Sequence, residues 1–183
     1  AQGNIPDISR GAFWLVDPLD GTKEFISRNG EFTVNVGLIE NGRPTLGVVY
    51  APAVDRLFWS EGPGRAFTQK NGKAVQIAAR TKPADGYVVV ASRSHSSSEE
   101  DEYLKTVPVK SVTSAGSSLK FCLVAAGEAD LYPRFGTTNE WDTAAGHAVL
   151  NAAGGKVVTR EGTELGYAKP TFKNPGFIAK GRD

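Results

Sequence analysis

Residues 11–22 read GAFWLVDPLDGT, an apolar run that ends in two aspartates, a proline and a glycine. The run up to Asp17 predicts a short buried strand, and Pro18 limits further pairing after it. The proline bends the chain between Asp17 and Asp20, so their carboxylates can converge on one point. Mg²⁺ prefers hard oxygen ligands in octahedral geometry. These two carboxylates and the backbone carbonyl of Leu19 would supply such oxygens.

The end of the same stretch has the features of a phosphate site. Gly21 and Thr22 would present backbone N–H groups at the start of a short helix-like segment, where phosphate is electrostatically favoured. The Thr22 hydroxyl could also orient a water, which makes Asp17, Asp20 and Thr22 the candidate catalytic residues. A capped strand-to-helix turn is the alternative, since all of these residue types are common in turns and caps. A bare D-P-x-D would favour that alternative, whereas the full hexapeptide after an apolar strand favours the metal site.

A second acidic motif, EWDTAAG, occupies residues 140–146. Asp142 would lie in the first turn of a predicted helix over 140–153, near the positive end of its dipole. One interpretation makes Asp142 a dipole-stabilising residue beside a core Trp141. The functional interpretation makes it a third carboxylate of the same metal centre, with short Ala and Gly residues that let the helix approach closely.

The remaining pattern predicts an α/β protein with layered sheets and helices in one domain. Residues 1–80 read as a mainly antiparallel half and residues 81–183 as an α/β half. The predicted strands are residues 11–17, 32–40, 44–50, 56–59, 66–69, 74–77, 87–91, 109–113, 131–135, 156–159 and 176–179. Asn41-Gly42 predicts a tight hairpin between two of them. Besides 140–153, helices are predicted from Ser97 to about residue 106, with a capping box, and from Gly116 to about residue 126.

Composition limits the function classes. The chain has 183 residues, of which 40% are apolar, and its 21 Lys and Arg nearly balance its 20 Asp and Glu. This balance argues against broad binding to nucleic acid polymers or anionic membranes, but it does not exclude a small anionic substrate. The single cysteine, Cys122, excludes an internal disulfide and fits a reducing cytoplasm. Its apolar neighbours predict a buried, unreactive thiol. No apolar run is long enough to span a bilayer.

Together the two motifs resemble the signatures of the inositol monophosphatase superfamily. WLVDPLDGTKEF resembles its D-P-[IL]-D-G-T motif, and EWDTAAGHAVL resembles its W-D-x-A-[AG]-G motif. The context is similar to the 3′(2′),5′-bisphosphate nucleotidase branch almost throughout, including GTKEFISRNGEFTVNVGLIENGRPTLGVVYAP, SRSH and GSSLKFCLVAAGEADLYPRFGTTNEWDTAAGHAVL. Thr137 departs from that branch, which has proline there. The resemblance implies the sugar-phosphatase fold, an α+β layered sandwich, without its N-terminal helices.

The resemblance also implies a nucleotide-binding set. In that branch the SRSH stretch, the G-S-S-x-K motif and the Arg before the W-D motif contact the nucleotide, beside the third metal aspartate. Carried over, these residues are His95, Gly116, Ser117, Lys120, Arg134 and Asp142. Backbone N–H groups before a helix can bind phosphate, and Lys and Arg add charge. The alternatives are that Ser117 only caps a helix, that Lys120 is solvated and that His95 only sits in a loop.

The implied activity is Mg²⁺-dependent hydrolysis of the 3′-phosphate of adenosine 3′,5′-bisphosphate to AMP and phosphate, with the sulfated analogue as a further substrate. Two alternatives stay open: inositol monophosphatase activity, and a non-catalytic remnant that binds nucleotide. The implied location is the cytoplasm. Peripheral association with the inner face of the membrane and a homodimer are left open.

Members of this family have a segment before the D-P-L-D-G-T strand. It contains helices, a hairpin and a Glu at a strand end that completes the metal site. Glu24 and Glu31 do not match the place of that Glu. We therefore expect residues 1–183 alone to be inactive or nearly so. We also expect the apolar surface that those helices would cover to be left bare unless another chain covers it. Either self-association through that face or a separately retained N-terminal piece is then expected.

Overall fold

The computed structural model describes residues 8, 11–70, 72–92 and 97–183. The first part of the chain forms one six-stranded sheet in which every strand pairs antiparallel with its neighbour in sequence. Its strands are β1 (Ala12–Asp20), β2 (Thr33–Glu40), β3 (Arg43–Ala51), β4 (Arg56–Ser60), β5 (Ala66–Lys70) and β6 (Lys73–Ile77). The predicted Asn41-Gly42 hairpin is confirmed, because both residues have positive φ and Glu40 pairs with Arg43. Two short helices join the strands, α1 (Thr22–Ile26) and the 3₁₀ turn η1 (Pro52–Val54).

The structure corrects the predicted end of strand β1. The strand was expected to end at Asp17, but it continues to Asp20, with a register shift between these two aspartates. Pro18 is tolerated because β1 is an edge strand of its sheet, where a missing N–H breaks no ladder bond. The shift displaces Asp20 from regular strand geometry, which matters for the site described below.

The second part of the chain forms a five-stranded sheet with the order β11-β13-β9-β7-β8 and a small β10-β12 pair. Its strands are β7 (Tyr87–Ser92), β8 (Val109–Ala115), β9 (Leu131–Arg134), β11 (Lys156–Thr159) and β13 (Phe177–Lys180). Strand β7 runs parallel to β8 and β9, and the other pairs are antiparallel. The two-residue strands β10 (Thr138–Asn139) and β12 (Lys173–Asn174) were not predicted.

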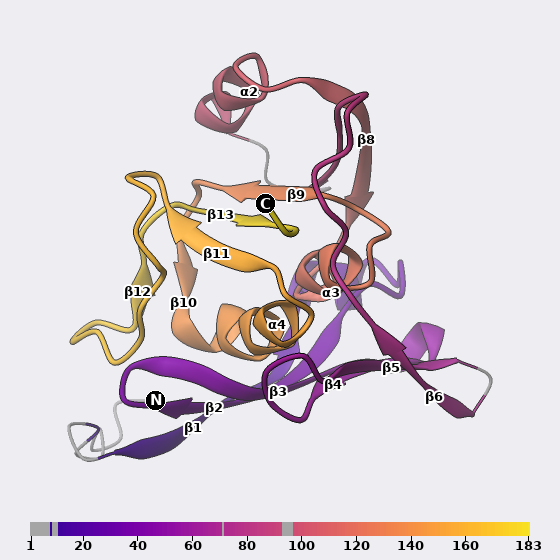
Figure 1. The fold of residues 1–183 in the computed structure, drawn as a ribbon. Helices are drawn as coiled ribbons and strands as arrows, with labels where there is room; N and C mark the ends of the chain where they lie inside the picture. Colours follow the sequence, from indigo (N-terminus) through magenta and orange to yellow (C-terminus); the bar gives the residue numbers. More distant parts are fainter. Residues whose placement is uncertain (1–7, 9–10, 71, 93–96) are drawn as a thin grey trace.

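Three longer helices belong to this part: α2 (Ser98–Leu104), α3 (Leu119–Ala125) and α4 (Glu140–Ala152). The capping box at Ser97 is confirmed. Helix α3 begins at Leu119 rather than at Gly116, because Ser117 has a φ of 51°, which a right-handed helix cannot contain. Helices α3 and α4 lie between the two sheets, and α2 lies on the far side of the five-stranded sheet (Figure 1).

Helix α4 packs very closely on the six-stranded sheet. Gly37 of β2 and Gly47 of β3 are directly paired beneath it. A Cβ on Gly37 would lie 2.8 Å from Ala144 Cβ, and one on Gly47 would lie 2.2 Å from the carbonyl oxygen of Ala145. Both distances are well below van der Waals contact. Small residues on helix and sheet therefore permit the approach, as the motif at residues 140–146 predicted.

The main core lies between the sheets and contains α3 and α4. Phe121, Tyr132 and Phe177 pack there as a cluster of three aromatic rings. Cys122 is fully buried beside them, and burial raises the pKa of its thiol far above the usual range. The prediction of a buried core thiol is confirmed.

The opposite face of the six-stranded sheet is apolar and exposed. Trp14 is 59% exposed and Val16 is 52% exposed. Their cross-strand partners, Leu38 and Val36, therefore share this face. An uncovered apolar face was expected. Within the described ranges, no helix combines the length and the apolar character needed to cross a membrane.

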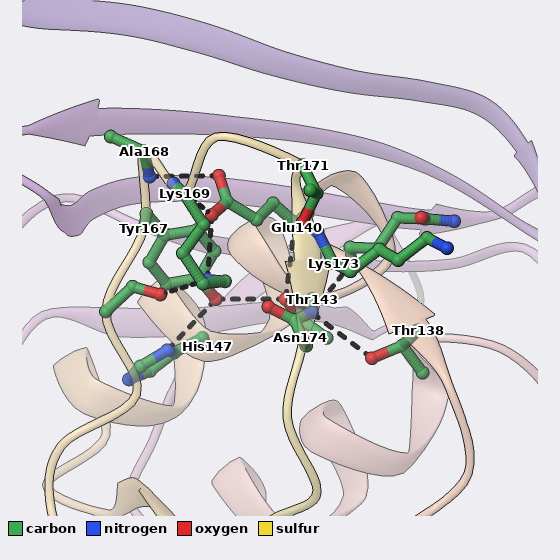
Figure 2. A network of polar contacts seen from close by, with 12 residues as sticks. Thr138, Glu140, Thr143, His147, Tyr167, Ala168, Lys169, Thr171, Lys173 and Asn174 are labelled. Atoms are coloured by element: carbon green, nitrogen blue, oxygen red, sulfur yellow. Dashed lines mark hydrogen bonds and ion pairs between the residues drawn. The ribbon is translucent and has the colours of Figure 1, made fainter. Parts of the chain in front are cut away.

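A buried polar network fixes the start of α4 (Figure 2). The Glu140 carboxylate is fully buried and accepts the backbone N–H groups of Ala168, at 3.0 Å, and Lys169, at 2.9 Å. The Lys169 ammonium also lies 2.7 Å from it. Nearby, the Asn174 amide donates to the Thr143 hydroxyl and to the Asn139 carbonyl. The first turn of α4 is thus held on both sides of Asp142.

We predict that Gly47→Ala destabilises the protein by roughly 3 kcal/mol, because the added methyl would collide with the backbone of α4. Gly166→Ala is the matched control, since a Cβ there would meet no atom within 4 Å. It should change stability by less than about 0.5 kcal/mol. Urea denaturation measures both, and equal stability of the two variants would contradict the packing account.

We predict a pH-dependent contribution from His147, which is fully buried against Tyr167 in the same network. Burial lowers the pKa of His147 to about 3 from 6.5. As the pH falls below about 6.5, the unfolded state takes up the proton first, so the folded state loses stability until the pH reaches about 3. The loss approaches about 1.4 kcal/mol per pH unit. His147→Gln should remove this part of the slope in denaturation curves between pH 6.5 and pH 4. An unchanged slope would show that His147 titrates normally in the fold.

Candidate active site

The end of β1 and the first turn of α4 bring together three carboxylates. Asp17, Asp20 and Asp142 each offer an oxygen, and these oxygens lie within 4.8 Å of one another. The two motifs, far apart in sequence, therefore form a single acidic centre. This convergence is what the motif spacing predicted for Asp17 and Asp20 and what the functional interpretation required of Asp142.

Each of these three carboxylates accepts a hydrogen bond from a backbone N–H through one of its two oxygens. The bonds are Leu19 N to Asp17 Oδ1 at 2.9 Å, Ser118 N to Asp20 Oδ2 at 2.8 Å, and Asn139 N to Asp142 Oδ2 at 2.7 Å. The Asn139 bond belongs to a capping box at the start of α4. Each carboxylate is therefore oriented through one oxygen, and the side chains of Asp17 and Asp142 also contact each other.

The electrostatics of this centre favour a cation. Burial, followed by the neighbouring carboxylates, raises the pKa of Asp142 to about 6 from 3.8. Burial, opposed in part by the Leu19 N–H, raises the pKa of Asp17. Crowded carboxylates repel one another unless a positive charge lies between them. The donor set consists of oxygens alone, which suits a hard divalent cation such as Mg²⁺.

A cleft opens beside the acidic centre and contains most of the predicted substrate residues. Its lining includes Asp20, Gly21, Thr22, Ser117, Lys120, Arg134 and Asp142. Thr137, the departure from the family pattern, also lines it. Two predicted residues differ: Gly116 is not in the lining, and His95 lies outside the described residues. The cleft thus places acidic and basic side chains around one space.

The two predicted glycines allow a tight contact between loops. Gly21 has a φ of 86°, and a Cβ there would lie 2.0 Å from Ser117 Oγ. A Cβ on Gly116 would lie 2.7 Å from the backbone oxygen of Glu31. The Ser117 hydroxyl closes the contact by donating to the Asp20 carbonyl at 2.9 Å. Gly116 is therefore explained by packing, which the sequence did not indicate.

The structure excludes two alternatives from the sequence analysis, a solvated Lys120 and a helix-capping Ser117. Lys120 is only 4% exposed, so a solvated surface lysine is excluded. Its ammonium donates to the carbonyls of Ser117 at 2.8 Å and Ala115 at 3.2 Å, and burial lowers its pKa to about 8. Ser117 does not cap α3, since Ser118 occupies the N-cap position. The two hydrogen bonds of Lys120 stabilise the turn at residues 115–117, and Ser117 of this turn lines the cleft.

Three buried polar side chains around Asp20 were missed by the sequence analysis. Thr33, Asn35 and Ser118 are each at most 1% exposed, and all three contact the Asp20 carboxylate. One signal was available: in the alternating strand 32–40, Thr33 and Asn35 share one face. Two polar residues on the same strand face indicate either solvent or a polar site.

Comparison with known proteins decides the family. The sequence pattern of the inositol monophosphatase family matches residues 2–182. The chain belongs to the inositol monophosphatase family. A crystal structure of CysQ from Bacteroides thetaiotaomicron, described as a bacterial member of this family, superposes with a TM-score of 0.86 at 39% identity, covering 100% of this chain and 75% of that one. The inositol monophosphatase of Anabaena superposes with a TM-score of 0.79 at 27% identity, covering 97% of this chain and 70% of that one. The predicted inositol monophosphatase-like fold is confirmed.

Curated members of the family include a close relative of this chain. The 3′(2′),5′-bisphosphate nucleotidase CysQ of Escherichia coli K12 is 56% identical over 166 residues. The match covers 90% of this chain and 66% of the relative, so the chain spans about two thirds of that relative's length.

We predict that Asp20→Asn weakens divalent cation binding by at least about tenfold, because it removes a charged oxygen ligand from the shared centre. Mn²⁺ is a suitable probe, since the electron paramagnetic resonance signal of the free ion measures the bound fraction. Asp85→Asn is the matched control, because Asp85 is exposed and pairs with Lys110. Equal Mn²⁺ affinity in all three proteins would place the cation elsewhere.

Proposed function

We propose that the chain is the metal- and substrate-binding part of a Mg²⁺-dependent phosphomonoesterase that removes the 3′-phosphate of adenosine 3′,5′-bisphosphate, giving AMP and phosphate. One observation carries the proposal: Asp20 and Asp142, two members of the three-carboxylate centre, line the same cleft as Lys120 and Arg134. An anionic substrate needs such a combination, because the acidic side can bind it only through a cation. The name of the Escherichia coli relative supports the same substrate class.

The placement of the residues at the acidic centre supports the following proposed roles. Asp17, Asp20 and Asp142 would hold Mg²⁺, with the Leu19 carbonyl as a further oxygen ligand. When bound, the cation supplies positive charge that stabilises phosphoryl transfer. The Gly21 and Thr22 side of the cleft would position the phosphate and, through the Thr22 hydroxyl, the attacking water.

The basic side of the cleft would bind the nucleotide. An ammonium group has three N–H donors, and the Lys120 ammonium uses two on backbone carbonyls. Among the described residues no further hydrogen-bond acceptor is seen for its third donor, which would be available to a phosphate oxygen. Arg134, at the end of β9, offers a planar guanidinium that can bind phosphate through two parallel hydrogen bonds. Ser117 contacts the Lys120 ammonium through its carbonyl oxygen and the Asp20 carbonyl through its hydroxyl. A substrate with two phosphates fits this division between an acidic and a basic side.

Inositol monophosphatase activity is the second candidate, because the Anabaena structure shares the fold at 27% identity. Steady-state turnover of adenosine 3′,5′-bisphosphate and inositol 1-phosphate, with Mg²⁺, separates the two. The assay uses a protein extended to the length of the curated relatives. We expect the higher kcat/KM on the nucleotide. A higher kcat/KM on the inositol ester would overturn the substrate assignment, and nucleotide binding without turnover of either would indicate a non-catalytic protein.

We predict that Arg134→Ala raises KM for the adenosine bisphosphate by roughly tenfold or more in that extended protein, since a charge-assisted hydrogen bond contributes about 1.5–3 kcal/mol. KM for inositol 1-phosphate should change far less. Arg65→Ala, which removes an exposed arginine paired with Glu61, is the control. An equal loss on both substrates would assign Arg134 to folding or to the acidic centre.

A further inference from the structure

We propose that Asn35 and Ser118 are positioning residues that orient the Asp20 carboxylate so that it offers a cation one oxygen only, Oδ1. The proposal rests on the metal centre of the proposed function. It adds residues outside the two acidic motifs, and it assigns them a role in both the affinity and the selectivity of that centre.

Asp20 Oδ2 is surrounded by polar groups of Thr33, Asn35 and Ser118. This oxygen lies 2.8 Å from Ser118 N, 3.0 Å from Ser118 Oγ, 3.1 Å from Asn35 Nδ2 and 3.3 Å from Thr33 Oγ1. Ser118 N, Asn35 Nδ2 and Thr33 Oγ1 donate to it, and three donors occupy the lone pairs of one oxygen. These hydrogen bonds to the carboxylate of Asp20 all converge on Oδ2. The carboxylate is therefore set up to coordinate through a single oxygen.

The Ser118 hydroxyl lies between the Asp20 carboxylate, at the end of β1, and the Asp142 carbonyl, in the first turn of α4. Ser118 Oγ lies 2.7 Å from the backbone carbonyl oxygen of Asp142 and accepts the second N–H of Asn35 at 2.9 Å. A hydroxyl has one proton to donate, and the carbonyl is its nearer acceptor. Ser118 thus donates to α4 with its hydroxyl and to Asp20 with its backbone N–H. The spacing between Asp20 and the first turn of α4 is fixed through this one residue.

The Asn35 side chain lowers the stability of the fold, because it buries a polar atom without a partner in the described part of the chain. Asn35 is 1% exposed, and its Oδ1 has no hydrogen-bond partner within the described residues. An unsatisfied buried acceptor is destabilising, and a leucine of similar size would avoid it. Turning the amide around would place Oδ1 against the Asp20 carboxylate. The donors of Asn35 toward Asp20 and Ser118 therefore explain its presence, whereas fold stability does not.

The experiment measures Mn²⁺ affinity by electron paramagnetic resonance in the 183-residue chain, together with the melting temperature without metal. The variants are Asn35→Leu and Ser118→Ala. Ser60→Ala is the matched control, a buried serine whose hydroxyl oxygen accepts the Gly47 N–H at 2.9 Å on the sheet. Competition with Mg²⁺ and Ca²⁺ then gives the selectivity of each protein.

We expect Asn35→Leu and Ser118→Ala to bind Mn²⁺ at least about tenfold more weakly. Their preference for Mg²⁺ over Ca²⁺ should also fall, because a released carboxylate can coordinate through both oxygens, as Ca²⁺ accepts. Asn35→Leu should melt within a few degrees of the parent, since it also removes the unsatisfied acceptor. Ser60→Ala should lower the melting temperature and leave Mn²⁺ affinity unchanged.

Three results would overturn the proposal. If both variants bind Mn²⁺ within twofold of the parent with unchanged selectivity, Asn35 and Ser118 do not position Asp20, while the metal centre itself stands. If affinity falls only as the folded fraction falls, their role is structural. If the parent chain binds no Mn²⁺, the metal centre fails together with the proposal. Asn35→Leu keeps the test decisive if Ser118→Ala does not fold.

Discussion

Helix α4 and the six-stranded sheet touch through backbone rather than through side chains. The directly paired Gly37 and Gly47 remove two side chains from the sheet, and alanines face them from the helix. Steric repulsion rises steeply below van der Waals contact, so this packing admits no larger residue without moving the helix. The acidic centre depends on it, because Asp142 reaches Asp17 and Asp20 only if α4 lies this low on the sheet. The polar network around Glu140 then prevents the helix from rotating or sliding at its first turn (Figure 2).

The electrostatics of the site follow from this constraint. Three carboxylates held within 4.8 Å repel one another, and burial adds to the cost of their charge. Backbone N–H groups offset part of this cost without neutralising it. Across the cleft, Lys120 and Arg134 form the opposite charge. The phosphate ester and divalent cation that we propose would complete both sides at once and offset the repulsion among the carboxylates.

The sequence was sufficient for the framework and for the centre of the site. Alternation and turn residues placed the strands and the hairpin at Asn41-Gly42, and capping and periodicity placed α2 and α4. The spacing around Pro18 indicated that Asp17 and Asp20 would converge. The small residues after Asp142 indicated the close approach of its helix. These features depend on neighbours along the chain, and local physical rules therefore reach them.

The remaining features depend on contacts between distant segments. Alternation separated the two faces of the strand 32–40 but could not show that the polar face, with Thr33 and Asn35, is the buried one beside Asp20. A lysine is usually exposed, so nothing local predicted the burial of Lys120 beneath the Ser117 turn. Pro18 suggested a strand end because the edge position of β1 was unknown.

The central claim is that the docking of α4 on the paired glycines creates one cation site from three carboxylates. A crystal of the chain soaked in Mn²⁺ and measured by anomalous diffraction tests it most directly. The account predicts an anomalous peak bonded to one oxygen each of Asp17, Asp20 and Asp142. A structure with no peak between these three residues, or with the strongest peak at another site, would contradict it.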